Sequence, residues 1–324
     1  MKKFVKISLM TAGILLIVGF VFGSVSALAC GGNVFRIIRE EDELDDKIES
    51  FVDAVGKSFY YSTDGRWGYL KDEHTSSSSN SSTVAGTSHQ IEADGIRNLE
   101  LELGAGTFII EEKGTDDGMI DILVSGTRID SYNDYVKGST LHVEGFKGWK
   151  WSDYNNAADN NEIRISFPKG SSLDKLDVET GASLMEISNI KVNKLDAELG
   201  AAVLYLNDMD IEKLSVEVGA GQMEASNIRT KDAEISVGVG ECIYGGTIAG
   251  KLDAECSMGN MEFHLTGSET DHNYEIECGA GNIEIGSFSV SALASEKTIN
   301  NNAASKFDIE CSMGNITIAF DNQE

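Results

Sequence analysis

Residues 176–187 read LDVETGASLMEI, and the pattern returns nineteen residues later as LDAELGAAVLYL at residues 195–206. The next copies, at the same spacing, are LSVEVGAGQMEA (214–225), AEISVGVGECIY (233–244) and LDAECSMGNMEF (252–263). Two more copies, YEIECGAGNIEI (274–285) and FDIECSMGNITI (307–318), start 22 and 33 residues after the preceding copy. These longer gaps predict insertions at a turn, the second bulging out around Ser287 to Ser305. Because nineteen residues are too few for a strand and a crossover helix, we expect about two strands and tight turns in each copy.

The strands of each copy are predicted from alternation. Leu195 and Leu199 fall on one face of the first strand, and Asp196 and Glu198 fall on the other, which is typical of a half-buried strand. No single copy can bury its apolar face, so the copies must stack with parallel strands in register. The sequence therefore predicts an all-β fold, a right-handed parallel β-helix (solenoid) with 19-residue coils. The regular coils span 176–263, and further coils lie at 274–285 and 307–318.

Two further columns of the repeat predict turns. Small residues recur after the first strand, with glycine at 181, 200, 219, 238 and 279 and again, two positions later in the coil, at 221, 240, 259, 281 and 314. Asn189, Asp208, Asn227 and Gly246 form another column, and these residue types tolerate left-handed backbone.

The segments before the repeat predict an N-terminal transmembrane helix and a short juxtamembrane helix. Residues 1–30 contain a 23-residue uncharged stretch, 7–29, behind three lysines, which is long enough to span a bilayer. Residues 31–72 are a juxtamembrane amphipathic region, with a helical pattern over 40–59. Residues 73–89 are a Ser-rich linker, and the β-solenoid domain spans 90–321.

The expected localisation is a single-pass membrane protein with its C-terminal domain outside the cytoplasm, because Lys2, Lys3 and Lys6 favour an internal N-terminus. Two alternatives remain open. Ala27-Leu28-Ala29 resembles a signal-peptidase site, which would release a secreted protein, and Cys30 stands where a lipoprotein could be acylated.

The charge limits the classes of partner. A net charge of −27 argues against nucleic-acid binding and against adsorption to anionic lipid. Acidic residues form two outward columns, and Lys175, Lys194, Lys213 and Lys251 stand beside them. The first column is Glu179, Glu198, Glu217, Ser236, Glu255, Glu277 and Glu310, and the second is Asp177, Asp196, Ser215, Glu234, Asp253, Glu275 and Asp308.

These acidic columns allow two interpretations. One is a solvated face that is partly paired with the lysines. The other is weak binding of a divalent cation such as Ca²⁺, although the glycine-rich calcium repeat is absent. The residues of this candidate cation ladder are Glu179, Glu198, Glu217, Glu255, Asp177, Asp196 and Asp253.

No catalytic, cofactor-binding or structural-metal residues are predicted. The five histidines fit no recognisable catalytic motif, and the carboxylates are spread evenly along the repeat. Cys256, Cys278 and Cys311 share one column with Leu199 and are expected to pack inward as small apolar side chains.

The copies of LD-x-E-x-GAG-x-x-x-I, with the strand IRISFPKG at residues 163–170, resemble the bacterial adhesin-like β-strand-repeat family DUF4097 over about residues 91–320. The resemblance implies a β-solenoid of the cell envelope, in some members linked to envelope-stress responses. This chain departs from the family pattern where CSMGN replaces the usual Gly-Ala-Gly turn in two coils.

The leading functional hypothesis is a non-catalytic surface scaffold that presents a binding face to a protein, a glycan or the cell wall. The alternatives are a self-associating structural module or envelope-stress sensor component, and a glycan-active β-helix enzyme.

Overall fold

The computed structural model describes residues 59–61, 67–69, 85–126, 128–146 and 161–321. The chain divides into two compact units, Met1–Ser82 and Thr83–Glu324. The first contains β1 (Phe59–Tyr61) and β2 (Trp67–Tyr69). The second contains β3 (Ala85–Glu92), β4 (Asn98–Glu112), β5 (Met119–Gly126), η2 (Ile129–Ser131), β6 (Asn133–Lys137), β7 (Thr140–Gly145), β8 (Glu162–Phe167), β9 (Ser172–Ser188), β10 (Lys191–Ile248), β11 (Lys251–Thr266), η4 (Glu269–Asp271), β12 (His272–Ile285), β13 (Phe288–Ile299) and β14 (Ser305–Asp321).

In the first unit, β1 and β2 pair antiparallel, with Tyr60 opposite Gly68. Phe59, the last residue of the expected juxtamembrane helix, lies in β1. The expected transmembrane segment, residues 1–30, and most of the region 31–72 lie outside the described residues. Within the described part of the chain, no helix has the length and apolar character needed to cross a membrane.

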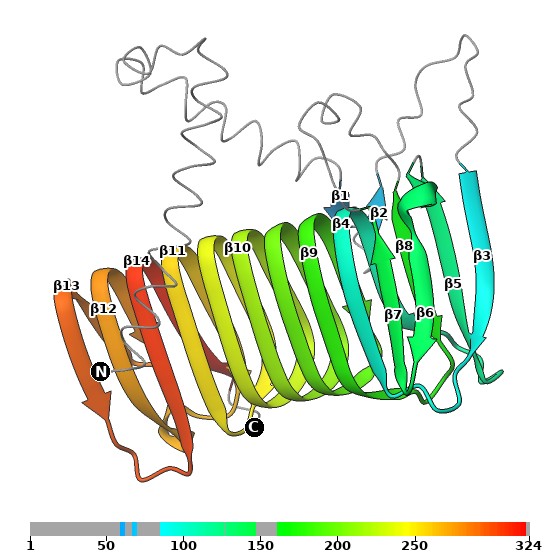
Figure 1. The fold of residues 1–324 in the computed structure, drawn as a ribbon. Helices are drawn as coiled ribbons and strands as arrows, with labels where there is room; N and C mark the ends of the chain where they lie inside the picture. Colours follow the sequence, from blue (N-terminus) through cyan, green and yellow to red (C-terminus); the bar gives the residue numbers. More distant parts are fainter. Residues whose placement is uncertain (1–58, 62–66, 70–84, 127, 147–160, 322–324) are drawn as a thin grey trace, which may run out of the picture. The chain divides into compact units, whose positions relative to one another are not determined.

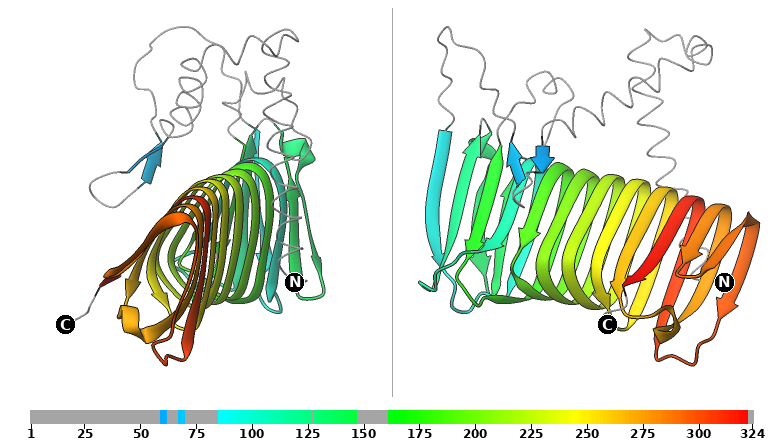
Figure 2. Two further views of the ribbon diagram at one scale, coloured as in Figure 1. Left: turned by 90° about the vertical axis from the view of Figure 1, so that its left-hand side faces the viewer. Right: turned by 180° about the vertical axis from the view of Figure 1, so that it is seen from behind.

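The second unit is all-β and solenoid-like. Its strands wind through successive layers that stack side by side, as the two views of Figure 2 show. The 58-residue β10 passes through several layers without a break. It pairs in parallel with β9 through Leu195 and Leu176, and with β11 through Ala233 and Leu252. Residues at the same position in successive copies of the repeat therefore lie in adjacent layers.

The layers do not follow chain order at the C-terminal end. The order of strands is β11–β14–β12–β13, so the last strand of the chain lies between β11 and β12 (Figure 1). The expected bulge around Ser287 to Ser305 is wrong, because most of that segment forms β13, which pairs antiparallel with β12. The last strand of the chain therefore does not end the stack. Skipping one layer requires a longer connection, and η4 with its flanking turn supplies it before β12.

At the other end, β4 continues the stack and also pairs in parallel with two shorter strands. Its first half pairs with β7 and its second half with β8. Antiparallel strands then complete this end: β6 on β7, and β5 on β8 with β3 outside it. β3 begins at Ala85, within the segment 73–89 that was expected to be a linker.

The interior confirms the predicted inward columns. Leu195, Ala197 and Leu199 are at most 3% exposed. Cys256 and Cys311 pair in register and Cys311 pairs with Cys278, so three buried cysteines lie in three adjacent layers. They pack as small apolar side chains, as expected.

The predicted column of residues with left-handed backbone is also confirmed. Asn189, Asp208 and Asn227 have φ values of 57°, 55° and 55°, and Gly246 has φ 151°. These positions require residues that tolerate positive φ.

Candidate functional site: charged columns and a groove

The acidic side chains form a ladder across the layers. Glu102 pairs in register with Glu179, and Glu179 with Glu198. Towards the C-terminal end, the register continues through Ser236, Glu255, Glu310, Glu277 and Glu296. Glu310 thus stands between Glu255 and Glu277, which the chain order of the copies did not predict.

Burial and like charge shift the pKa values along this ladder. The pKa values of Glu217 and Glu255 are raised, first by burial and then by neighbouring carboxylates. Burial, with repulsion from Glu277 and Glu255, raises the pKa of Glu310 to about 7. The Glu310 carboxyl is therefore partly protonated at neutral pH.

Lysines run along the ladder, as the sequence predicted for Lys175 and Lys194. Lys175 contacts Asp177, and the Nζ of Lys194 lies 2.5 Å from Asp196 Oδ2. Near the C-terminal end, the Nζ of Lys306 lies 2.7 Å from Glu275 Oε2. Such exposed pairs offset part of the repulsion but contribute little each, about 0–1 kcal/mol.

The residues of the candidate cation ladder are not brought into one site. In one column Asp177 pairs in register with Asp196. In the other column the uncharged Ser236 pairs with Glu255 and interrupts the row of carboxylates. Among the described residues, no three His, Cys, Asp or Glu side chains are grouped so that they could hold a metal ion. Calcium binding by Glu179, Glu198, Glu217, Glu255, Asp177, Asp196 and Asp253 stays a prediction.

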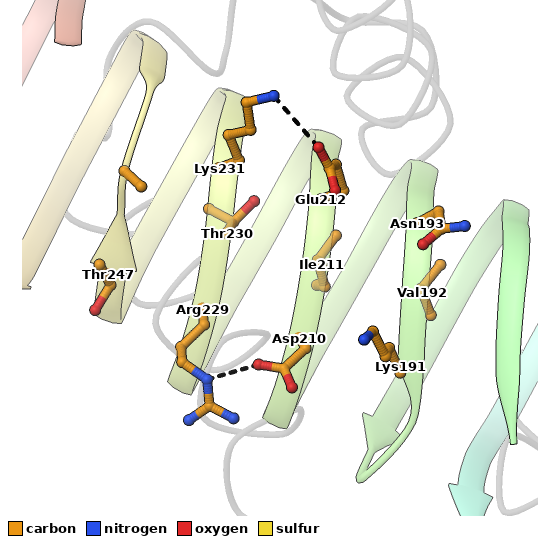
Figure 3. A pocket seen from close by; sticks show the side chains of 11 residues that line it. Lys191, Val192, Asn193, Asp210, Ile211, Glu212, Arg229, Thr230, Lys231 and Thr247 are labelled. Carbon is orange, nitrogen blue, oxygen red and sulfur yellow. Dashed lines mark hydrogen bonds and ion pairs between the residues drawn. The ribbon is translucent and has the colours of Figure 1, made fainter. Parts of the chain in front are cut away.

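A shallow groove, which the sequence did not predict, crosses several layers (Figure 3). Its cavity volume is about 390 Å³. The lining residues are Lys191, Val192, Asn193, Asp210, Ile211, Glu212, Arg229, Thr230, Lys231, Thr247 and Ala249.

The groove has an apolar floor between two charged rims. Val192 and Ile211 are at most 2% exposed and form the floor. On one rim the Nε of Arg229 lies 2.6 Å from Asp210 Oδ1, and on the other the Nζ of Lys231 lies 3.3 Å from Glu212 Oε1 (Figure 3). Two outward rows of side chains on one strand lie roughly 7 Å apart, which sets the distance between the rims.

The repeat could have revealed this groove. Lys191, Asp210 and Arg229 recur every nineteen residues, two positions after the left-handed turn column. Because the charge changes sign from copy to copy, these positions do not stand out as a column.

The described histidines do not form a nucleophile–base pair. His89, His142 and His264 each lie 2.9–3.2 Å from a carboxylate oxygen, of Asp134, Glu100 and Glu262 respectively. His272 is buried, and its Nδ1 lies 2.6 Å from Ser305 Oγ. The Ser305 hydroxyl, however, donates to the carbonyl of Gly250, so its proton does not point to the imidazole as base-assisted attack requires.

Comparison with known proteins points to one family. The family model described as Toastrack DUF4097 matches residues 96–295. No curated protein matches the chain.

Several solved structures resemble the fold. A candidate cell adhesion protein from Clostridium sporogenes matches at 15% identity and a TM-score of 0.37, covering 74% of this chain and 100% of that one. A candidate adhesin from Bacteroides fragilis matches at 14% identity and a TM-score of 0.42, covering 74% and 97%. A candidate lipid binding protein from Parabacteroides distasonis matches at 16% identity and a TM-score of 0.40, covering 72% and 96%.

Proposed function

Because this chain belongs to the Toastrack DUF4097 family, we propose that it is a non-catalytic, adhesin-like protein of the cell envelope. Its solenoid-like unit presents a rigid binding face to a protein, a glycan or a cell-wall polymer. The observation that carries this proposal is the groove, whose rims and floor are built from adjacent layers of one continuous strand. A surface fixed by backbone pairing loses little conformational entropy on binding.

The architecture of the all-β stack can be specified further. We propose that it is a right-handed parallel β-helix with 19 residues in each coil. The register of Leu195 with Leu176 and of Ala233 with Leu252 supports it, since both pairs are nineteen residues apart.

The proposed localisation rests on the N-terminal sequence. Lys2, Lys3 and Lys6 precede the apolar stretch 7–29, which supports a single-pass anchor with the β-unit outside the cytoplasm. Cleavage after Ala29, with secretion, is the alternative.

A binding measurement tests the proposed face. The full-length protein is incubated with isolated cell-envelope fragments, and bound protein is measured by co-sedimentation. The variant Arg229→Ala/Lys231→Ala removes the two ion-paired cations of the groove rims, and we expect it to weaken binding at least about tenfold, which corresponds to roughly 1.4 kcal/mol.

The matched control is Lys175→Ala/Lys194→Ala, which also removes two ion-paired cations, but from the acidic ladder. Equal loss of binding in both variants would point to net charge and contradict a role for the groove. Release of sugars from the fragments would instead support a glycan-active enzyme.

Self-association is a second candidate, favoured by the character of β13. This strand lies at the edge of the described sheet, and Phe288–Ser295 contains no charged residue. Long uncharged edges without proline readily pair with another strand. Light scattering of the full-length protein over a range of concentrations tests this candidate. Ser289→Lys should reduce the association, whereas Ser226→Lys, exposed within β10, should not.

A further inference from the structure

His272 lies where the chain order of the layers is broken. It is the first residue of β12, and Ser305, with which it pairs in register, is the first residue of β14. Gly250 directly precedes β11. These three positions therefore mark the starts of the three adjacent layers β12, β14 and β11.

A chain of hydrogen bonds joins the starts of β12, β14 and β11. The Ser305 hydroxyl donates its one proton to the carbonyl of Gly250, so it must accept from His272. His272 Nδ1, 2.6 Å away, therefore carries a proton and donates it to Ser305 Oγ. The ring is held as the neutral Nδ1–H tautomer, and proton uptake can occur only at Nε2.

The surroundings of the ring favour its neutral form. His272 is 6% exposed, and its ring stacks on Phe307 at 4.0 Å and on Phe320 at 5.7 Å between centroids. Tyr274 meets the ring edge at 6.3 Å. A charged imidazole in this aromatic site loses most of its hydration, and a cation–π contact of about 0.5–2 kcal/mol replaces only part of it.

The charged groups nearby are already engaged. In η4, Asp271 Oδ2 accepts from the backbone of Ser268, and both carboxylate oxygens of Glu269 accept from Ser287. Lys306, next to Ser305 on β14, pairs with Glu275. Lys251, next to Gly250, adds a further positive charge at the start of β11. Of these, Asp271 favours the protonated ring, but burial outweighs it and lowers the pKa of His272.

We propose that His272 is an acid-sensitive latch that holds β14 between β11 and β12, so that mild acid loosens these C-terminal layers before the rest of the stack. Protonation at Nε2 is more favourable when the ring is hydrated than when it is stacked in the core. Acid therefore shifts the equilibrium toward a state in which the starts of β12 and β14 have separated.

The direction in which the stability of the latch changes with pH follows from the lowered pKa of His272 in the folded state. The latch contributes its full stability above the ordinary histidine value of 6.5 and loses it as pH falls below that value. One proton taken up on opening changes the opening constant by at most tenfold per pH unit. Between pH 7.5 and 5.5 we expect opening to increase by up to about tenfold.

Hydrogen exchange of the full-length protein, corrected for intrinsic rates, tests the latch. Peptides covering the starts of β12 and β14 should lose about tenfold in protection between pH 7.5 and 5.5, whereas peptides covering 195–206 should not. His272→Gln keeps a donor for Ser305 but cannot titrate, so it should abolish the difference. His264→Gln, an exposed histidine of the neighbouring β11, should leave it intact.

A second measurement keeps the test decisive if His272→Gln does not fold. Exchange of the imidazole C2 proton, followed by mass spectrometry on the unmodified protein, reports the titration of each histidine. A midpoint for His272 below that of His264, together with the local loss of protection, supports the latch. An ordinary midpoint, or equal loss of protection along the whole stack, overturns it.

Discussion

At the scale of single residues, backbone conformation and steric space can both require glycine at a turn. Gly240 has φ 142°, and a Cβ there would overlap the carbonyl oxygen of Gly221 in the adjacent layer. Gly95 has φ 83° but has nothing within 4 Å of its Cβ position. The first site therefore combines backbone strain with a clash, and the second has strain alone.

We predict that Gly240→Ala destabilises the protein by more than about 3 kcal/mol, because the layers must move apart to admit the methyl group. Gly95→Ala should cost only about 1 kcal/mol. Urea unfolding of both variants measures the difference, and equal losses would show that the layers can shift at no cost.

The raised pKa of Glu310 has a stability consequence with a defined sign. The folded state favours the protonated Glu310 carboxyl. The contribution of this carboxyl to stability is therefore greatest below its ordinary pKa of 4.5 and is lost as pH rises through about 7. Glu310→Gln should therefore raise stability at pH 8 by about 1 kcal/mol, after allowance for solvent screening, and change little at pH 4. Thermal unfolding at the two pH values checks this, with Glu198→Gln, exposed in the same column, as the comparison. A gain from Glu310→Gln that is the same at both values would mean that ionisation is not its cause.

At the scale of elements, the sequence predicted the strands but not their order. Alternation and the column of left-handed residues identify strands and turns because each depends on local geometry. The order of layers depends on where a longer connection leads, and gaps of 22 and 33 residues fit either a bulge or a skipped layer. One signal was present: ECSMGN occurs at 255–260 and again at 310–315, and these identical segments are direct neighbours in the structure.

The groove was not predicted from the sequence for a different reason. One rim changes sign from layer to layer and the other begins with the uncharged Asn193, so no column of one charge stood out. By contrast, the buried cysteine column and the lysines beside Asp177 and Asp196 followed directly from side-chain alternation.

The order of layers makes a prediction at the same scale. Deleting β14, residues 305–321, removes the strand on which β12 pairs, so β12 and β13 should both become sensitive to protease while β10 remains protected. Truncation after Asp321 is the control and should change nothing. If β12 kept its protection without β14, the layers would be able to stack in chain order after all.

At the scale of the whole molecule, charge opposes compaction. The net charge is −27, and in-register carboxylates about 5 Å apart repel by roughly 1 kcal/mol per pair even in water. Exposed ion pairs such as Lys194–Asp196 offset little of this. Stability should therefore depend on screening, which shortens the range of repulsion from about 30 Å at 0.01 M salt to 3 Å at 1 M.

We predict that the unfolding temperature rises by several degrees between 0.01 and 1 M NaCl, since a change of 1 kcal/mol shifts a unit of this size by about 2–4 °C. CaCl₂ at matched ionic strength should give the same rise, because the described carboxylates lie in rows and form no group that could hold a metal ion. A larger rise with CaCl₂, lost in Glu179→Gln/Glu198→Gln, would show that the ladder binds calcium at discrete positions. A fall in unfolding temperature with salt would mean that ion pairing, and not repulsion between carboxylates, dominates the surface of the stack.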